Sequence, residues 1–317
     1  MKLIKSDMME LKLNIAGLIE QIKKQKKVKK AILQVPDGLK TEAQNIIDKL
    51  STATKVQFYL DIEPVYGACD LASNFLESIN ADLIIHLGHS KFCETNKKVI
   101  YWPTYYDMAA EELNILSKNI EEKLKLKKIS LVGPIQYSKI IRELEKQIKN
   151  VKIVKTTKTN LLNESQILGC DTSILDEITD KVDAIVYIGD GNFHISALPQ
   201  KVQIYQLDNL DIVLYDQKDE LKSKIMSEYI FKNAKNIGIL VTSKIGQNNY
   251  TIGEKIYDNL KKQGKNPYLL IADFISYDKI MGLKLDCLVN TACPRIIDDK
   301  ENYKIQIINY KNVLKYI

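Results

Sequence analysis

The chain has 317 residues, 45% hydrophobic and 27% charged, with only 13 glycines and 7 prolines, which excludes collagen-like and disordered proteins. Its net charge of +6 comes almost entirely from lysines scattered at helical spacing without an aromatic stacking surface. We therefore expect no direct nucleic-acid binding, the alternative being a basic RNA-binding protein with steep salt dependence. No apolar run approaches the roughly 18 residues of a membrane span, and the length suits two or three domains.

The predicted elements, in chain order, are an N-terminal helix and three copies of one unit of strands and amphipathic helices. The strands are expected at 30–35, 56–60, 82–86 and 98–101, at 128–132, 151–154, 183–187 and 201–205, and at 237–241, 268–271, 286–290 and 304–308. An aspartate introduces each third strand. Near-continuous apolar strands that alternate with helices indicate parallel sheets. We predict an α/β fold of three similar domains, 1–108, 109–217 and 218–317, each a four-stranded parallel sheet flanked by helices.

The unusual residues of the chain follow the first and third strands of each unit. In open parallel sheets the loops at the carboxyl ends of the strands form the ligand crevice. These loops are Pro36-Asp37-Gly38-Leu39, Gly88-His89-Ser90, Gly133-Pro134, Gly189-Asp190-Gly191-Asn192-Phe193-His194, Thr242-Ser243-Lys244 and Thr291-Ala292-Cys293-Pro294-Arg295. If the three domains meet with these edges inward, the loops converge on one central cavity.

The five cysteines are odd in number and far apart, and the first 20 residues show no charged-then-apolar leader, so we expect reduced thiols in the cytoplasm. Cys69 and Cys170 each follow a small residue and precede an aspartate, and Cys293 lies in a carboxyl-end loop of the third unit. Each domain thus contributes one cysteine. We expect Cys287, inside an apolar strand, to be a buried hydrophobe, and Cys93, which has no counterpart, not to be a ligand.

Three converging thiolates indicate a soft metal centre. Structural zinc usually has four ligands in close pairs, and no Cys-x-x-Cys occurs, but His86, His89 and His194 could complete a catalytic zinc site. An iron–sulfur cubane held by three cysteines leaves one iron open for a substrate. The spacing alone does not distinguish zinc from an iron–sulfur cluster. The alternative to both is that the three cysteines are unrelated and buried.

Six stretches, in order between about residues 31 and 299, resemble the archaeal diphthamide synthases, the 2-(3-amino-3-carboxypropyl)histidine synthase family. They are Leu33-Gln34-Val35-Pro36-Asp37-Gly38-Leu39, Tyr66-Gly67-Ala68-Cys69-Asp70, His86-Leu87-Gly88-His89-Ser90, Leu168-Gly169-Cys170, Gly189-Asp190-Gly191-Asn192-Phe193-His194 and Ala292-Cys293-Pro294-Arg295. The resemblance implies pseudo-threefold symmetry, a homodimer, and a central [4Fe-4S] cluster held by Cys69, Cys170 and Cys293. One departure is the single cysteine before Asp70, where relatives often have a longer cysteine-containing run.

The resemblance also implies a reaction. S-adenosylmethionine would give its 3-amino-3-carboxypropyl group to C2 of a histidine imidazole in translation elongation factor 2, leaving 5′-methylthioadenosine. Imidazole C2 is a poor nucleophile, so a radical route is implied, started by one electron from a cluster that a donor protein reduces. The Cys-x3-Cys-x2-Cys loop of conventional radical enzymes is absent, and the resemblance implies cleavage at the methionine γ-carbon, selected by geometry.

The remaining loop residues receive weaker assignments. We expect Arg295, one of two arginines in the chain, to clamp the carboxylate of S-adenosylmethionine, the alternative being an ion pair with Asp298 or Asp299. His89 and His194 are candidate catalytic proton acceptors from the imidazole C2–H, whereas His86 is expected to be a strand-end residue satisfied by packing. Further candidates for cofactor contacts are two Asp-Gly pairs, Asp37-Gly38 and Asp190-Gly191. The alternative is that these pairs only form turns, since Asp-Gly is an ordinary turn signal.

Two rival functions remain at this point. A quinolinate synthase also has three pseudo-symmetric domains and a three-cysteine cluster, but it needs neither S-adenosylmethionine nor a protein substrate. The Pro-Asp-Gly-Leu and Cys-Pro-Arg contexts favour the diphthamide family. A non-catalytic iron–sulfur partner that relays electrons is the second rival, and the presence of all three cysteines favours catalysis.

Overall fold

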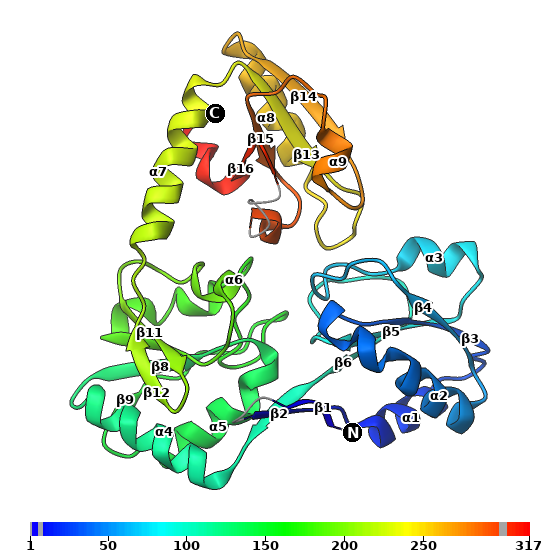
Figure 1. Ribbon diagram of the computed structural model, residues 1–317, viewed down its shortest axis with the longest axis vertical. Coiled ribbons are helices and arrows are strands. Elements are labelled where there is room, and N and C mark those ends of the chain that lie inside the picture. Colours follow the sequence, from blue (N-terminus) through cyan, green and yellow to red (C-terminus); the bar gives the residue numbers. More distant parts are fainter. Residues whose placement is uncertain (1, 6–8, 298–302) are drawn as a thin grey trace. The chain divides into compact units, whose positions relative to one another are not determined.

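The computed structural model describes residues 2–5, 9–297 and 303–317. Its contacts divide the chain into two compact units, Met1–Tyr215 and Asp216–Ile317 (Figure 1). The first unit contains two parallel sheets and the second unit contains one. The predicted domain boundaries at 108 and 217 stay a prediction. No helix among the described residues is long and apolar enough to cross a membrane.

The three parallel sheets share one strand order. Counted along the chain, the first strand of each sheet lies between the second and third, and the fourth lies beside the third. In the order along the chain, the strands are β3 (Lys30–Gln34), β4 (Gln57–Asp61), β5 (Leu83–Gly88) and β6 (Val99–Pro103), then β8 (Lys128–Val132), β9 (Lys152–Ile153), β10 (Ala184–Tyr187) and β11 (Gln203–Asp208), then β13 (Asn236–Val241), β14 (Asn266–Ile271), β15 (Cys287–Asn290) and β16 (Gln306–Asn309). Every predicted strand is present, and the predicted α/β fold with parallel sheets is confirmed.

The sheets are covered by helices in a repeated way. The helices are α1 (Ile15–Lys24), α2 (Ala43–Thr54), α3 (Ser73–Ser78), α4 (Ala110–Lys123), α5 (Ser138–Gln147), α6 (Asn192–Ile195), α7 (Lys218–Asn233), α8 (Tyr250–Lys262) and α9 (Tyr277–Ile280). Two long helices share a hydrophobic core with each sheet, namely α1 and α2, α4 and α5, and α7 and α8. The N-terminal helix α1 is therefore the counterpart of α4 and α7, because all three precede the first strand of their sheet.

The aspartate before each third strand has a structural role that explains its recurrence. A carboxylate oxygen of Asp82 accepts the backbone N–H groups of Lys29 and Lys30 at 2.8 and 3.0 Å. Asp286 accepts those of Lys235 and Asn236 at 2.8 and 2.7 Å, and Asp183 accepts that of Lys128 at 2.7 Å. Each aspartate thus ties the start of the third strand to the start of the first, which sets the register of the two central strands.

The first residues of the chain form part of an antiparallel sheet that the sequence did not predict. Strands β1 (Lys2–Lys5) and β2 (Met9–Lys12) pair with each other, and β2 pairs with β7 (Tyr105–Met108). A further strand, β12 (Asp211–Leu214), pairs antiparallel with β11. These four-residue strands are too short for a clear periodicity, and β7 pairs with β2 from almost a hundred residues further along the chain.

Candidate active site at the carboxyl ends of the strands

Close packing of glycine and proline joins the loops at the carboxyl end of the first sheet. Gly88 ends β5 with a φ of +87°, a conformation that favours glycine. A Cβ atom on Gly88 would lie 2.8 Å from Cγ of Pro36, in the loop after β3. The second sheet repeats this contact, since a Cβ on Gly189 would lie 3.0 Å from Cδ of Pro134. The loops after the first and third strands therefore pack against each other in both sheets.

Cys69 lies in a tight turn in which the N–H of Asp70 donates to the carbonyl of Gly67 at 3.0 Å. The Cys93 thiol donates to the carbonyl of Ala68, the residue before Cys69, at 3.5 Å, and lies 3.9 Å from the Tyr101 hydroxyl. Burial raises the pKa of the Cys93 thiol. The structure thus brings Cys93 next to the Cys69 turn, a proximity that the spacing along the chain did not reveal.

Cys170 lies at the tip of a turn that is closed from both sides. Leu168 and Asp171 exchange backbone hydrogen bonds of 2.9 and 3.1 Å, so Gly169 and Cys170 form the tip. The N–H of Gly169 donates to Nδ1 of His194 at 3.0 Å. A Cβ on Gly169 would lie 2.4 Å from the carbonyl oxygen of Phe193, so only glycine allows this approach. The segment that carries His194 therefore supports the turn that carries Cys170.

The loop that follows β5 touches both cysteine-bearing segments of the first unit. Cys93 contacts Ala68, as described above, and the side-chain amide of Gln166 donates to Oγ of Ser90 at 2.8 Å. The amide of Gln136 also donates to the carbonyl of Gly88 at 2.8 Å. His89, half-buried in this loop, therefore lies near the segments that lead to Cys69 and Cys170.

Cys293 belongs to the second unit and lies in the loop after β15, where it is buried. The side chain of Asn290, at the end of β15, donates from Nδ2 to the Cys293 carbonyl at 2.8 Å and accepts the N–H of Ala292 at 3.0 Å. Asn290 is a positioning residue that sequence reasoning missed, although a polar side chain at the end of an apolar strand was its signal. Arg295 is exposed two residues further on, and Asp298 and Asp299 lie outside the described residues.

Besides Arg295, the other four expected cofactor contacts are also exposed. Asp37 forms an ion pair with Lys40 at 2.6 Å, and Gly38 lies in the short 3-10 helix that Asp37 begins. Asp190 accepts a hydrogen bond from Tyr137, and burial is the main cause that raises the pKa of that hydroxyl. Gly191 has a φ of +68°, so this position favours glycine. Both aspartates have local partners, and their contact with a cofactor stays a prediction.

His86 is held by more than packing. Its side chain is fully buried, with Nδ1 2.9 Å from Oε1 of Gln34 and Nε2 3.0 Å from Nδ1 of His89. Burial holds the pKa of His86 well below its usual range, and the neighbouring His89 lowers it further. The buried neutral imidazole is therefore a hydrogen-bonded neighbour of the candidate catalytic residue.

The five cysteines differ in their surroundings. None of the five forms a disulfide, and Cys69 and Cys170 are partly exposed in their loops. Burial raises the pKa of Cys287 to about 12, as expected for a thiol inside an apolar strand. Within the part of the chain that the structure describes, no three His, Cys, Asp or Glu side chains are grouped closely enough to hold a metal ion. Thiols are the soft ligands that iron–sulfur clusters take, and a shared cluster on Cys69, Cys170 and Cys293 stays a prediction.

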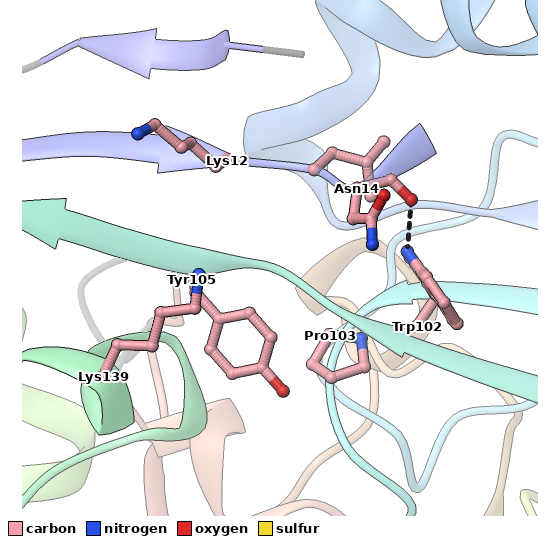
Figure 2. A pocket seen from close by; sticks show the side chains of 7 residues that line it. Lys12, Asn14, Trp102, Pro103, Tyr105 and Lys139 are labelled. Atoms are coloured by element: carbon pink, nitrogen blue, oxygen red, sulfur yellow. Dashed lines mark hydrogen bonds between the residues drawn. The ribbon is translucent and has the colours of Figure 1, made fainter. Parts of the chain in front are cut away.

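A cavity of about 420 Å³ lies elsewhere in the first unit (Figure 2). Its lining residues come from the end of β2, from β6 and β7, and from α5. The indole N–H of Trp102 donates to the carbonyl of Asn14 at 3.2 Å along one wall, and the Lys139 ammonium lies 5.1 Å from the centre of the Tyr105 ring. No predicted site residue lines this cavity, so it is separate from the candidate active site.

Known proteins similar to this chain point to one family. The model of the diphthamide synthesis protein family matches residues 35–313. The 2-(3-amino-3-carboxypropyl)histidine synthase of Methanocaldococcus jannaschii is 30% identical over 90% of this chain and 86% of its own length. The enzyme of the same name from Pyrococcus horikoshii is 27% identical over 90% of this chain and 84% of its own length. Both names denote transferases.

A solved structure shows the same fold. The crystal structure of Dph2 from Pyrococcus horikoshii with a 4Fe-4S cluster matches with a TM-score of 0.83, covering 95% of this chain and 89% of that chain at 24% identity. Family membership decides against the quinolinate synthase alternative. The chain belongs to the diphthamide synthesis protein family, whose curated relatives are named as transferases.

Proposed function

We propose that this protein transfers the 3-amino-3-carboxypropyl group of S-adenosylmethionine to C2 of a histidine in translation elongation factor 2, releasing 5′-methylthioadenosine. The proposal rests on family membership together with one observation. Each of three parallel sheets with the same strand order has a candidate ligand in a loop beyond its strands, namely Cys69, Cys170 and Cys293, and the first sheet has Cys93 in a second loop. The presence of all three cysteines favours a catalytic site over a non-catalytic partner, in which one could have been lost.

Cys69, Cys170 and Cys293 would hold a [4Fe-4S] cluster, as the thiol donor set suits iron and the related Pyrococcus protein is described with such a cluster. When bound, the cluster would supply one electron and an open iron for S-adenosylmethionine. The protein contributes rigidity to this site. The turn of Cys170 is closed by two backbone hydrogen bonds and backed by His194, and the loop of Cys293 is held by Asn290.

The other loop residues would bind and orient the co-substrate. The exposed guanidinium of Arg295 suits the methionine carboxylate, because its planar fork binds a carboxylate through two hydrogen bonds. Asp37 and Asp190 are candidate acceptors for the ammonium or the ribose hydroxyls, with Gly38 and Gly191 allowing close approach. His89 and His194 are the two candidates for accepting the proton that leaves C2 of the substrate imidazole.

We also propose that the enzyme is an archaeal-type homodimer that works in the cytoplasm and receives electrons from a donor protein. Five cysteines without a disulfide suit a reducing compartment. The third sheet offers a surface for a second copy, because its edge strand β14 carries the exposed apolar side chains of Tyr268, Leu269 and Ile271. Exposed apolar edge strands favour pairing with another chain. Sedimentation velocity of the wild type and of Ile271→Lys tests the dimer, and a wild-type monomer would reject it.

The activity is tested by anaerobic reconstitution with iron and sulfide, reduction with dithionite, and incubation with S-adenosylmethionine and elongation factor 2. We expect 5′-methylthioadenosine in step with a histidine whose mass has increased by one aminocarboxypropyl group. Formation of 5′-deoxyadenosine as the main product would refute the proposed bond cleavage. A cluster that forms without either product would favour the electron-relay alternative.

A further inference from the structure

A row of polar side chains crosses the first sheet near the carboxyl ends of its strands. Asp61 of β4, Gln34 of β3 and His86 of β5 are direct neighbours in the strand register. Gln34 Nε2 lies 2.9 Å from Oδ2 of Asp61, and Gln34 Oε1 lies 2.9 Å from Nδ1 of His86. The row continues from Nε2 of His86 to Nδ1 of His89 at 3.0 Å. Gln34 and His86 are 1% and 0% exposed, so this row of hydrogen bonds runs through the interior to the loop that carries His89.

The sheet itself does not require this polar row. The three sheets repeat one fold, and their register places Val132 and Leu240 where the first sheet has Gln34. Both of those residues are buried and apolar. A buried amide loses its hydration and needs partners that a leucine or valine does not. A position that departs from the pattern of its two structural copies, at the edge where the candidate active site lies, indicates a functional role.

The hydrogen bonds of this row run in one direction. Asp61 accepts at Oδ2 from Gln34 and at Oδ1 from the N–H of Glu63 at 3.1 Å, so the NH₂ group of Gln34 faces Asp61. The carbonyl oxygen of Gln34 can only accept, which places the hydrogen of the neutral His86 ring on Nδ1. Nε2 of His86 is then an acceptor. The donor in the last hydrogen bond is consequently Nδ1–H of His89.

We infer that Asp61, Gln34 and His86 fix the hydrogen of His89 on Nδ1 and thereby make Nε2 of His89 the proton acceptor for the substrate imidazole. This inference rests on the proposed function. After the aminocarboxypropyl carbon has bonded to C2, the C2–H bond breaks and its proton moves to Nε2 of His89. The electron pair of that bond restores the aromatic ring, and the one excess electron leaves to a one-electron acceptor, the role of the iron–sulfur cluster. Gln34 and His86 are positioning residues in this scheme.

The assignment differs for the other candidate base. Nδ1 of His194 accepts the N–H of Gly169, so the hydrogen of a neutral His194 ring is on Nε2. The two candidates thus have opposite tautomers, and His194 supports the Cys170 turn. This contrast selects His89 as the base and His194 as a positioning residue for the cysteine.

The tautomers can be measured directly because the chain contains only three histidines. We would label the full, anaerobically purified chain with ¹⁵N-histidine and record long-range ¹H–¹⁵N correlation spectra, assigning the signals with His86→Gln and His194→Gln. We expect the Nδ1–H pattern for His86 and His89 and the Nε2–H pattern for His194. A neutral His89 with its hydrogen on Nε2 would overturn the inference.

The positioning role is tested with Gln34→Leu, which installs the residue type that the other two sheets have at this position. We expect the ¹⁵N shifts of His86 and His89 to change while those of His194 stay, and the transfer rate to fall about tenfold to a hundredfold. The KM for S-adenosylmethionine and the release of 5′-methylthioadenosine without elongation factor 2 should stay within about twofold, since neither step needs the base. Asp61→Asn replaces one of the two accepting oxygens of Asp61 by an NH₂ group, so the ¹⁵N shifts of His86 and His89 should change in this variant as well.

The outcomes separate this inference from the proposed function. Unchanged His89 shifts and an unchanged transfer rate in Gln34→Leu reject the inference while the wild type still modifies the elongation factor. Absence of both products in the wild type rejects the proposed function instead. The thermal unfolding of Gln34→Leu shows whether a lower transfer rate comes from loss of structure. A melting temperature near that of the wild type together with a normal transfer rate again contradicts the inference.

Discussion

Replacement of Gly169 by alanine tests how the fold holds Cys170. The added methyl group would lie 2.4 Å from the carbonyl oxygen of Phe193 and 2.7 Å from its ring, and a backbone oxygen has no other rotamer to adopt. The turn and the segment of Phe193 must therefore separate. That movement also lengthens the hydrogen bond from the Gly169 N–H to His194, now 3.0 Å.

Two costs contribute to the expected loss of stability. Inserting a methyl group into a packed site typically costs about 1–3 kcal/mol, and the weakened hydrogen bond costs about 1 kcal/mol. For a unit of this size, about 2–4 kcal/mol corresponds to a fall of roughly 5–15 °C in melting temperature. Cluster binding should be weakened more than the fold is destabilised, because Gly169 is the direct neighbour of the proposed ligand Cys170.

The assays are thermal unfolding followed by circular dichroism, and iron content per chain after anaerobic reconstitution. Gly38→Ala is the matched control, because its backbone has an ordinary φ and no atom lies within 4 Å of the added Cβ. This control should be neutral or stabilise the protein by about 0.4–1 kcal/mol. A Gly169→Ala protein with the melting temperature and iron content of the wild type would refute the packing argument for the Cys170 turn.

Three further predictions concern the carboxylate of Asp286 and the cysteines. Backbone hydrogen bonds from Asn236 and Lys235 lower the pKa of Asp286 below its ordinary value of 3.8. The charged carboxylate therefore stabilises the fold above pH 3.8, and this stabilisation is lost as the pH falls through the lowered pKa. The difference in urea midpoint between wild type and Asp286→Asn should accordingly shrink from about pH 6 to about pH 3, and a constant difference would contradict this linkage. Cys287, whose pKa is about 12, should resist iodoacetamide in the folded, cluster-free protein while Cys69 and Cys170 react, as mass spectrometry would show. Serine at Cys69, Cys170 or Cys293 should abolish the absorbance of a reconstituted cluster, whereas Cys93→Ser should keep it, and loss of iron from Cys93→Ser would make that thiol a ligand.

The sheets could be predicted because their signals are local. Near-continuous apolar runs such as that of β10 and amphipathic runs such as that of α5 occur within a few residues, and burial of those side chains is what forms each layer. The recurring aspartates were also visible in the sequence, although their hydrogen bonds to the start of the neighbouring strand were not. The antiparallel strands β2 and β7 escaped prediction because each depends on a distant partner.

The sequence by itself determined the fold class, the repeat of three and the family, and it predicted Cys69, Cys170 and Cys293 as the candidate ligands. Only the tertiary structure decided which polar side chains meet. Gln34 lies 27 residues from Asp61 and 52 from His86 along the chain, and the three become neighbours through the strand register. Cys93 likewise reaches the Cys69 turn across 25 residues, at Ala68. Hydrogen bonds act over about 3 Å, so the partners at this site are set by strand register and loop packing, which no local pattern contains.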